Sequence, residues 1–365
     1  MEIYIPWRVR LAAYRVYQQI RCALSQAKWG KKTEPTISFY CNYHQTTGAS
    51  VAIASIANQL AERYNVDIYI RPQSCYSQLL ALRVRQTFSP ASLAGSMVFV
   101  DIEQENAIVE DLCNNGRKVI LTCHALPVQL HAVSQPKLIR NLELASVIHF
   151  VSECQQTEFI NHYPQLPIAE KSFVIPNYTR QSIKQVFTGN VGIVGYLSRP
   201  QKNALRAIDL AQRSNAQHIE CWGSTEIAGL DNPRLYSKLR INGWTDKTSV
   251  MHASFDVLIS TSKFETFGLV VMEALSAGIP CVLSDIPVFR SLYGNCKGVV
   301  ILSGEDDRDV QSINDLLREA PTLKPAIIDY WQKHFSNESV KAAWFKQVGI
   351  LSTKTFDNPE VQQAQ

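Results

Sequence analysis

Two glutamates in the segment SKFETFGLVVMEALSAGIP (residues 262–280) have the spacing of a ligand site. Glu265 and Glu273 are eight positions apart, and the residues between them carry no charge. A helix is predicted to begin near Gly268, where its free N–H groups favour an anion and where a glycine allows close approach of a ligand. A carboxylate on either side can accept hydrogen bonds from hydroxyl groups. The segment therefore predicts a site for a phosphate between two polyols, which describes a nucleotide sugar.

Other polar residues follow predicted strands elsewhere in the chain. In a parallel sheet, ligands bind at the carboxyl ends of the strands, so the loop after each strand is the place to look. Gly48 follows the strand at 37–42, and His124 follows the strand at 118–123. Arg199 and Lys202 follow the apolar run that ends at residue 195. These loops offer a close backbone approach, an imidazole and two cations for phosphates.

The elements that must position these residues are short Val- and Ile-rich runs that alternate with helical patterns. Such runs are typical of strands covered on both faces, and the alternation indicates parallel sheets. The alternation stops at a polar stretch, residues 178–190, and then restarts. The sequence predicts an α/β protein with two doubly wound Rossmann-like domains. In chain order, the predicted parts are a basic segment at 1–33, a first domain at 34–180, a second domain at 181–351 that ends in a helix at 336–351, and a tail at 352–365.

The composition agrees with this organisation. The chain has 365 residues, 46% of them hydrophobic, which suits two domains of ordinary size. It has no apolar run of about 20 residues and no apolar signal-peptide core. Its nine cysteines include no C-x-x-C pair, which favours free thiols in a reducing compartment. We therefore expect a cytoplasmic protein.

The N-terminal segment differs from the rest in charge. Residues 1–33 hold seven Lys or Arg residues and one Glu, so they carry +6 and the remainder of the chain carries −2. Their helical periodicity places one apolar stripe between two basic flanks.

A basic helix of this kind suits an anionic membrane surface, which would make the protein peripheral on the inner face of the plasma membrane. The stripe could equally dock on the protein's own domain. No nucleic-acid recognition module accompanies the charge, so no nucleic-acid partner is expected. The stripe and its flanks comprise Val9, Ala13, Val16, Tyr17, Ile20 and Leu24, with Arg8 and Arg15 on one side, Arg10, Arg21 and Lys28 on the other, and Trp7 and Trp29 at the ends.

The segment around the two glutamates resembles the E-x7-E motif of retaining glycosyltransferases of the GT-B fold, specifically glycosyltransferase family 4. Other segments agree, over about residues 37–290. The second-domain motifs are the specific ones. The segments are TTGASVAIASIANQLAERYNVDIYI, VILTCHALP, VIPNY, GIVGYLSRPQKNALRAI and CWGS.

The resemblance implies two Rossmann-like domains that face a cleft and a role for each candidate residue. Glu273 would hold the ribose of a UDP- or GDP-linked sugar, and Glu265 would contact hydroxyls of the transferred sugar. Lys202 would bind the diphosphate, and His124 would lie near the donor sugar. The remaining residues implied at the donor are Arg199, the backbone N–H groups of Phe267, Gly268 and Leu269, and Gly48. The acceptor would be a glycan or a lipid-linked molecule, as in bacterial envelope polysaccharide synthesis.

One position departs from the family pattern. The family usually has Arg where this chain has Tyr196, and Arg199 in the same loop is the candidate replacement. This departure motivates an alternative, a non-catalytic scaffold that binds sugar nucleotides. A second alternative is a GT-B-fold nucleotide-sugar epimerase, against which the E-x7-E motif argues. The donor base, the sugar, the acceptor and the linkage are not specified by the sequence.

No cofactor and no metal are expected. The acidic run EDDRD (residues 305–309) is predicted to be a surface loop, and enzymes of this resemblance generally need no metal. Cysteine and histidine are not clustered, which argues against a zinc site.

Overall fold

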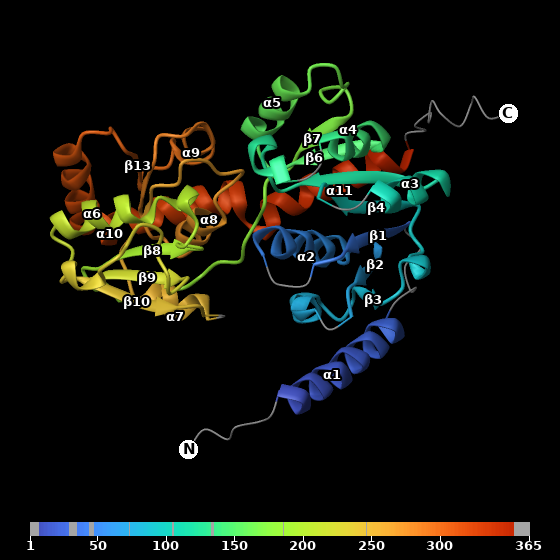
Figure 1. The fold of residues 1–365 in the computed structure, drawn as a ribbon, viewed down its shortest axis with the longest axis horizontal. Coiled ribbons are helices and arrows are strands. Elements are labelled where there is room, and N and C mark those ends of the chain that lie inside the picture. The colour runs from blue at the N-terminus through green and yellow to red at the C-terminus, as the bar shows by residue number, and fades with distance from the viewer. Residues whose placement is uncertain are drawn as a thin grey trace. The chain divides into compact units, whose positions relative to one another are not determined.

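The computed structural model divides into two compact units, each built around its own parallel sheet (Figure 1). Unit 1 comprises Met1–Ile175 with Lys341–Gln365, and unit 2 comprises Pro176–Val340. The structure describes residues 7–28, 35–43, 47–72, 74–103, 106–132, 135–184, 186–245 and 247–353.

The sheet of unit 1 has seven strands in the order β3-β2-β1-β4-β5-β6-β7, and every neighbouring pair is parallel. The strand order reverses between β1 and β4, which is the topological switch point of this sheet. The strands are β1 (Thr36–Cys41), β2 (Asn65–Ile70), β3 (Arg85–Thr87), β4 (Met97–Asp101), β5 (Lys118–Cys123), β6 (Val147–Phe150) and β7 (Ser172–Val174).

Helices connect most of these strands, and the central strand β4 is buried along its whole length. All five residues of β4 are buried, as the continuous apolar run predicted for a strand covered on both faces. The helices of unit 1 are α1 (Trp7–Lys28), α2 (Gly48–Leu60), α3 (Asn106–Asn114), α4 (Gln135–Leu144), α5 (Glu153–His162) and most of α11 (Asn337–Thr353), with 3-10 turns η1 (Cys75–Leu79), η2 (Pro90–Ser92) and η3 (Pro127–Ala132).

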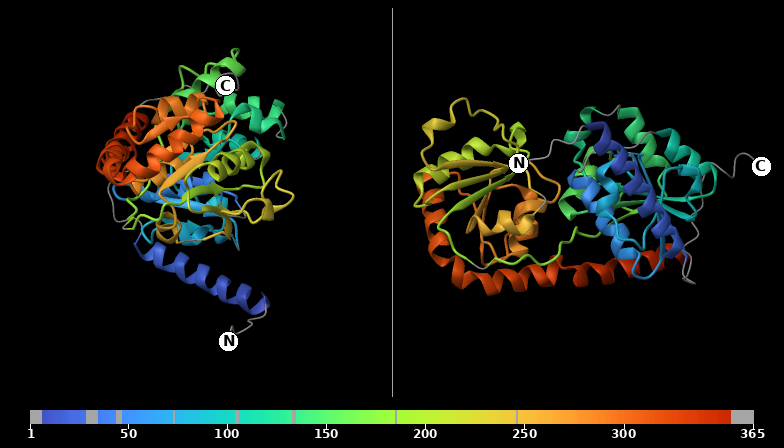
Figure 2. Two further views of the ribbon diagram at one scale, coloured as in Figure 1. Left: turned by 90° about the vertical axis from the view of Figure 1, so that its left-hand side faces the viewer. Right: turned by 90° about the horizontal axis from the view of Figure 1, so that it is seen from below.

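The sheet of unit 2 has six parallel strands in the order β10-β9-β8-β11-β12-β13, with helices on both of its faces (Figure 2). Its order reverses between β8 and β11. The elements are β8 (Val191–Gly195), η4 (Pro200–Lys202), α6 (Ala204–Arg213), β9 (Ile219–Gly223), η5 (Pro233–Leu235), β10 (Leu239–Gly243), α7 (Thr248–Ala253), β11 (Val257–Ser260), α8 (Leu269–Ser276), β12 (Cys281–Leu283), α9 (Pro287–Tyr293), β13 (Val299–Ile301) and α10 (Asp306–Phe335).

Two predictions about the end of the chain are corrected. The last helix was assigned to the second domain, but from Lys341 onward it belongs to unit 1. The reason is the buried ring of Trp344, which packs against Phe99 of β4 and His149 of β6, with ring centroids 5.8 and 4.7 Å apart. The helix also runs to Thr353, two residues into the predicted tail, and the rest of that tail lies outside the described residues.

The longest helix was not predicted. α10 has 30 residues and contains Pro321 and Pro325, which are typical helix breakers and hide its periodicity. It begins inside the acidic run that was predicted to be a loop, so that prediction is wrong. Among the described residues, no helix is both long enough and apolar enough to cross a lipid bilayer.

Candidate functional site

Two loops meet at the switch point of unit 2, one after β8 and one after β11. The hydroxyl of Thr261 donates to the carbonyl of Asn203 at 2.7 Å, and the backbone N–H of Lys263 donates to the carbonyl of Gln201 at 2.8 Å. Both residues that flank Lys202 are therefore tied to the stretch that precedes Glu265. These bonds fix the position of Lys202, which is the last residue of η4.

An ion pair joins the two loops. Lys202 Nζ lies 2.5 Å from Glu265 Oε1, which also accepts a hydrogen bond from the hydroxyl of Ser262 at 2.9 Å. The side chains of Lys202 and Glu265 are 19% and 12% exposed, so both are reachable by a ligand. The structure thus brings together the cation and the first carboxylate predicted from the sequence, in a position where an anion could compete for the ammonium group.

The start of α8 follows this pair directly. Its N-cap residue, Gly268, has a left-handed φ of +86°, and no side chain caps the helix. The first N–H groups of a helix have no intrahelical partner, so those at Leu269 are available to an anion. A Cβ at Gly268 would lie 2.7 Å from Phe289 Cε1, so both the φ value and the space require glycine.

The side chain of Phe267 has a structural role. It is 1% exposed and packs edge-on against the ring of Tyr293, with centroids 6.2 Å apart. The hydroxyl of Tyr293 donates to the carbonyl of Phe267 at 3.0 Å. These contacts hold the backbone at the helix start, so that only its N–H group can serve the donor role predicted for Phe267.

The second carboxylate, that of Glu273, lies farther along α8. Burial raises the pKa of Glu273 to about 7, from an ordinary value of 4.5. Within the described part of the chain, this carboxylate forms no hydrogen bond or ion pair. Its backbone carbonyl accepts from the hydroxyl of Ser276 at 2.6 Å. A half-buried carboxylate in this state can accept hydrogen bonds from the hydroxyls of a ligand.

Arg199 is turned toward an aromatic pair. Its guanidinium lies over the ring of Tyr196, 4.7 Å from the centroid, and that ring packs against Trp244 at 4.6 Å. The replacement of the family arginine by Arg199 therefore stays a prediction. Trp244 was missed by the sequence analysis because β10, the strand before it, has too little apolar character to be recognised. It is 61% exposed and offers a flat surface to a planar ring.

Residues 235–332 match the model of the family described as Glycosyl transferases group 1. The match includes Glu265, all of α8 and Glu273, whereas Lys202 and Arg199 precede it. The part of the chain with this likeness is therefore the part that carries both carboxylates.

Two relatives have names that concern cell-envelope glycans. The chain is 23% identical over 228 residues to the poly(ribitol-phosphate) alpha-N-acetylglucosaminyltransferase of Staphylococcus aureus, which is 58% of this chain and 45% of that protein. It is 32% identical over 60 residues to the O-antigen biosynthesis glycosyltransferase WclY of Escherichia coli, 16% of this chain and 17% of that one. The chain thus spans less than half the length of the curated relatives it matches.

The fold is also found in a solved structure. Anabaena HepE in complex with UDP and glucose superposes with a TM-score of 0.70 at 16% identity, over 87% of this chain and 100% of that one. The predicted fold class, α/β with two Rossmann-like units of the GT-B type, is confirmed.

The candidate residues of the first domain lie in unit 1. His124 follows β5, and its Nδ1 lies 3.2 Å from Oδ2 of Asp101, the last residue of β4. This contact fixes the orientation of the His124 ring. The ring centroids of His124 and His149 are 6.5 Å apart. Burial lowers the pKa of His149 to about 3, so the His149 ring is neutral.

Gly48 is the first residue of α2, and a capping box formed by Thr47 and Ser50 surrounds it. Thr47 Oγ1 accepts from the N–H of Ser50 at 3.2 Å, and Ser50 Oγ accepts from the N–H of Thr47 at 2.7 Å. Gly48 and His124 belong to unit 1 and the other candidates to unit 2, so their action on one ligand stays a prediction.

The aspartates of the acidic run at 305–309 have structural partners. Asp307 lies in the first turn of α10 and pairs with Arg213 at 2.5 Å, and Asp309 accepts from the N–H of Ser303 at 2.7 Å. Within the described ranges, no group of three or more His, Cys, Asp or Glu side chains could hold a metal ion. That the reaction needs no metal and no cofactor stays a prediction.

Proposed function

We propose that this chain is a retaining glycosyltransferase of family 4. It transfers a sugar from a UDP- or GDP-linked donor to a glycan or a lipid-linked acceptor in the synthesis of a bacterial cell-envelope polysaccharide. The observation that carries the proposal is the Lys202–Glu265 ion pair beside the uncapped start of α8. The names of the two relatives support the envelope context.

In this proposal the diphosphate of the donor binds between Lys202 and the start of α8. Its negative charge competes with Glu265 for the ammonium group, which releases that carboxylate to accept hydroxyls of the sugar. As the bond to the sugar breaks, charge grows on the leaving phosphate, and the ammonium group and the helix N–H groups stabilise it. The carboxylate of Glu273 accepts hydrogen bonds from the ribose.

Retention would follow from attack on the face that the phosphate leaves. The bond between the anomeric carbon and the phosphate oxygen breaks, and the bond from the acceptor oxygen forms on the same side. The acceptor proton passes to the departing phosphate oxygen, so no protein base is required. His124, oriented by Asp101, would hold the donor sugar, and Gly48 would admit the diphosphate to the loop before α2.

The contact between Arg199 and Tyr196 favours one alternative, a scaffold that binds the nucleotide sugar without turning it over. With Arg199 engaged on Tyr196, the diphosphate has Lys202 as its cation and lacks a second partner. A scaffold and an enzyme would both bind the donor, but only the enzyme would transfer the sugar. An epimerase would instead convert the donor without any acceptor.

The first test is a thermal-shift screen of the full chain against UDP, GDP and their common sugar conjugates. A ligand at about 100 times its Kd stabilises the folded protein by about 2.7 kcal/mol. We expect one nucleotide family to raise Tm by about 4 to 8 °C, with the shift lost in Lys202→Ala. If no nucleotide or nucleotide sugar changes Tm, the proposal is wrong. If the donor binds but no glycan or lipid-linked acceptor is glycosylated, the scaffold is favoured.

A further inference from the structure

The N-terminal helix α1 packs against the edge strand β3 of unit 1, and it does so through polar side chains. Gln18 Nε2 and the hydroxyl of Tyr14 both donate to the carbonyl of Ser74, at 2.8 and 2.7 Å. Arg21 donates to the carbonyl of Leu80. Gln18 is 3% exposed, so this side of the helix is the one buried against the sheet.

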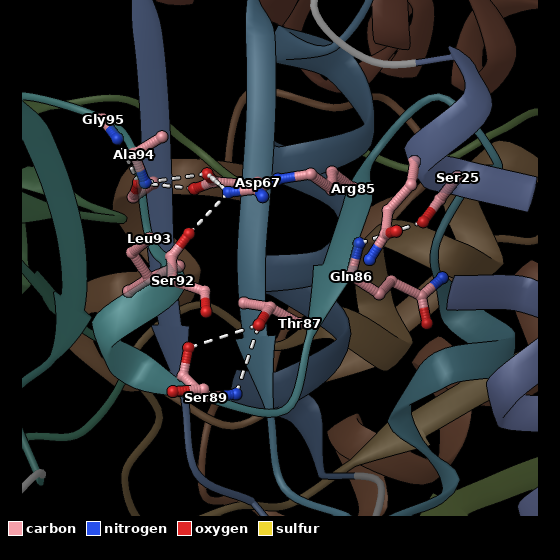
Figure 3. A network of polar contacts seen from close by, with 12 residues as sticks. Ser25, Asp67, Arg85, Gln86, Thr87, Ser89, Ser92, Leu93, Ala94 and Gly95 are labelled. Atoms are coloured by element: carbon pink, nitrogen blue, oxygen red, sulfur yellow. Dashed lines mark hydrogen bonds and ion pairs between the residues drawn. The ribbon is translucent and has the colours of Figure 1, made fainter. Parts of the chain in front are cut away.

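A second set of bonds pairs α1 with the backbone of β3. Ser25 Oγ accepts from the N–H of Gln86 at 3.1 Å, and Cys22 Sγ lies 2.9 Å from the carbonyl of Gln86. Figure 3 shows Ser25 beside Gln86, with Arg85 reaching the other way to Asp67 on β2. α1 therefore closes the free edge of the sheet, which would otherwise expose unpaired backbone groups.

The strand that supports α1 is firmly held. Asp67 is fully buried and accepts hydrogen bonds from Arg85 at 2.5 Å, from the hydroxyl of Ser38 at 2.5 Å and from the N–H of Ala94 at 2.9 Å (Figure 3). Three charge-assisted bonds on one buried carboxylate fix β3 against β2. Because Cys22 and Ser25 contact the backbone of Gln86 in β3, the position of β3 determines which side of α1 faces the sheet.

Because the polar side faces the sheet, the apolar stripe faces away from it. Val16, Tyr17, Ile20 and Leu24 are 54%, 39%, 54% and 47% exposed. The expectation that this stripe docks on the protein's own domain is therefore wrong for these four residues. A contiguous exposed apolar stripe on a helix indicates a surface that binds something else.

The charge of the helix identifies the partner. The sequence of α1 contains five Lys or Arg residues and no Asp or Glu. These basic residues are distributed along the whole sequence of the helix, from Arg8 to Lys28. A second copy of the chain would bring like charges together along this face. A surface of acidic phospholipid headgroups offers negative charge at the flanks and hydrocarbon beneath the stripe.

We propose that α1 binds the surface of an anionic phospholipid bilayer, with Val16, Tyr17, Ile20 and Leu24 inserted at the level of the headgroups. The contacts of Gln18 and Ser25 with η1, β3 and their flanks then hold unit 1 on the aqueous side of the helix. This places the chain at a membrane whatever the reaction that unit 2 carries out. In a bacterium, the anionic cytoplasmic leaflet is the surface that such a helix fits.

The test is flotation of the full chain with vesicles of phosphatidylglycerol and phosphatidylcholine, compared with vesicles of phosphatidylcholine alone. The variant is Ile20→Ser with Leu24→Ser, which removes two apolar side chains from the stripe. Its matched control is Gln19→Ser with Gln26→Ser, two exposed positions on the same helix. All four side chains are exposed, so both variants are expected to fold, and the Tm of each verifies this.

We expect the chain to float with the anionic vesicles, less so at 0.5 M salt, and to bind neutral vesicles at least tenfold more weakly. The stripe variant is expected to lose at least tenfold in vesicle affinity, and the control to keep it. The proposal fails if the chain does not bind anionic vesicles or if the stripe variant binds as well as the control. It also fails if the stripe mediates a dimer, seen as a sedimentation mass that the stripe variant halves, with no vesicle binding.

Discussion

Helices α2 and α8 begin at comparable places, one at the switch point of each sheet, yet their starts are satisfied in different ways. α2 begins at Gly48, and a reciprocal pair of bonds between Thr47 and Ser50 occupies the N–H groups of these two residues. α8 follows Gly268 in a left-handed conformation, with no capping side chain. From the sequence the two starts look alike, because each has a glycine in the loop that follows a predicted strand.

The difference indicates which helix start can hold an anion. A helix start whose N–H groups already have side-chain partners has less to offer a ligand than one that is uncapped. The surroundings agree, because the loop before α8 carries the Lys202–Glu265 pair. α2 has no charged residue in its 13 positions, whereas α8 has a single carboxylate, Glu273. Unit 2 therefore has the features that the proposal requires for binding a nucleotide sugar, and the role proposed for unit 1 depends on His124.

The largest effect expected from this comparison is on catalysis. Lys202→Ala removes the cation that would stabilise the leaving phosphate, and we expect kcat/KM to fall by about 100- to 1,000-fold. The control is Lys263→Ala in the facing loop, since Lys263 is exposed and uses only its backbone in the contact with Gln201. The measurement is steady-state transfer with the donor identified by thermal shift.

A loss of less than threefold in Lys202→Ala would mean that the charge on the phosphate is met elsewhere. An equal loss in both lysine variants would mean that the effect is general and does not depend on the pair with Glu265.

The next effect concerns the backbone that leaves α8 uncapped. Gly268→Ala meets both a φ of +86° and the ring of Phe289, 2.7 Å from the new Cβ. Gly304 has the same φ of +86° but nothing within 4 Å of its ideal Cβ, so Gly304→Ala has the φ strain alone. We expect Gly304→Ala to cost about 1 to 2 kcal/mol and Gly268→Ala about 1 to 3 kcal/mol more.

Thermal unfolding of both glycine variants beside the wild type measures this difference. Equal losses of Tm in the two would show that Phe289 yields at little cost and that the glycine is required for its φ alone. We expect Gly268→Ala also to reduce the thermal shift given by the donor, because its helix start is displaced.

Much of this organisation is encoded in local patterns. The buried strands of both sheets are predicted by short Val- and Ile-rich runs, since a strand covered on both faces must be apolar throughout. Glu265 and Lys202 are predicted because polar residues after such strands must lie at one edge of a sheet, and Glu273 is predicted from its spacing from Glu265. The pairing of Lys202 with Glu265 then follows from the adjacency of β8 and β11.

Other features depend on contacts that a local pattern does not contain. α10 continues through two prolines because Ile313, Leu316, Ile327 and Trp331 are buried along one of its faces, and that packing outweighs the lost hydrogen bonds. α1 shows the opposite case, because its periodicity is correctly predicted but the side that docks is the polar one. Which face is buried was decided by the unpaired edge of β3, a feature of the sheet and not of the helix.

The smallest expected effect concerns Glu273, the one charged residue of α8, which has no counterpart in α2. Burial raises the pKa of Glu273 to about 7 from 4.5, so the folded state holds this proton more tightly than the unfolded state between these values. Its contribution to stability is complete below about pH 4.5 and is lost as the pH rises through about 7. Glu273→Gln should therefore gain about 2 kcal/mol relative to the wild type between pH 5 and pH 8. Glu226→Gln, at an exposed carboxylate of the same unit, should show no such trend, and denaturation at both pH values measures the difference.

If the Glu273 carboxylate accepts ribose hydroxyls, donor affinity in the wild type should rise over the same interval and stay level in Glu273→Gln. If donor affinity rises equally in the wild type and in Glu273→Gln, another group causes the pH dependence. Glu273 would then have no part in binding the ribose.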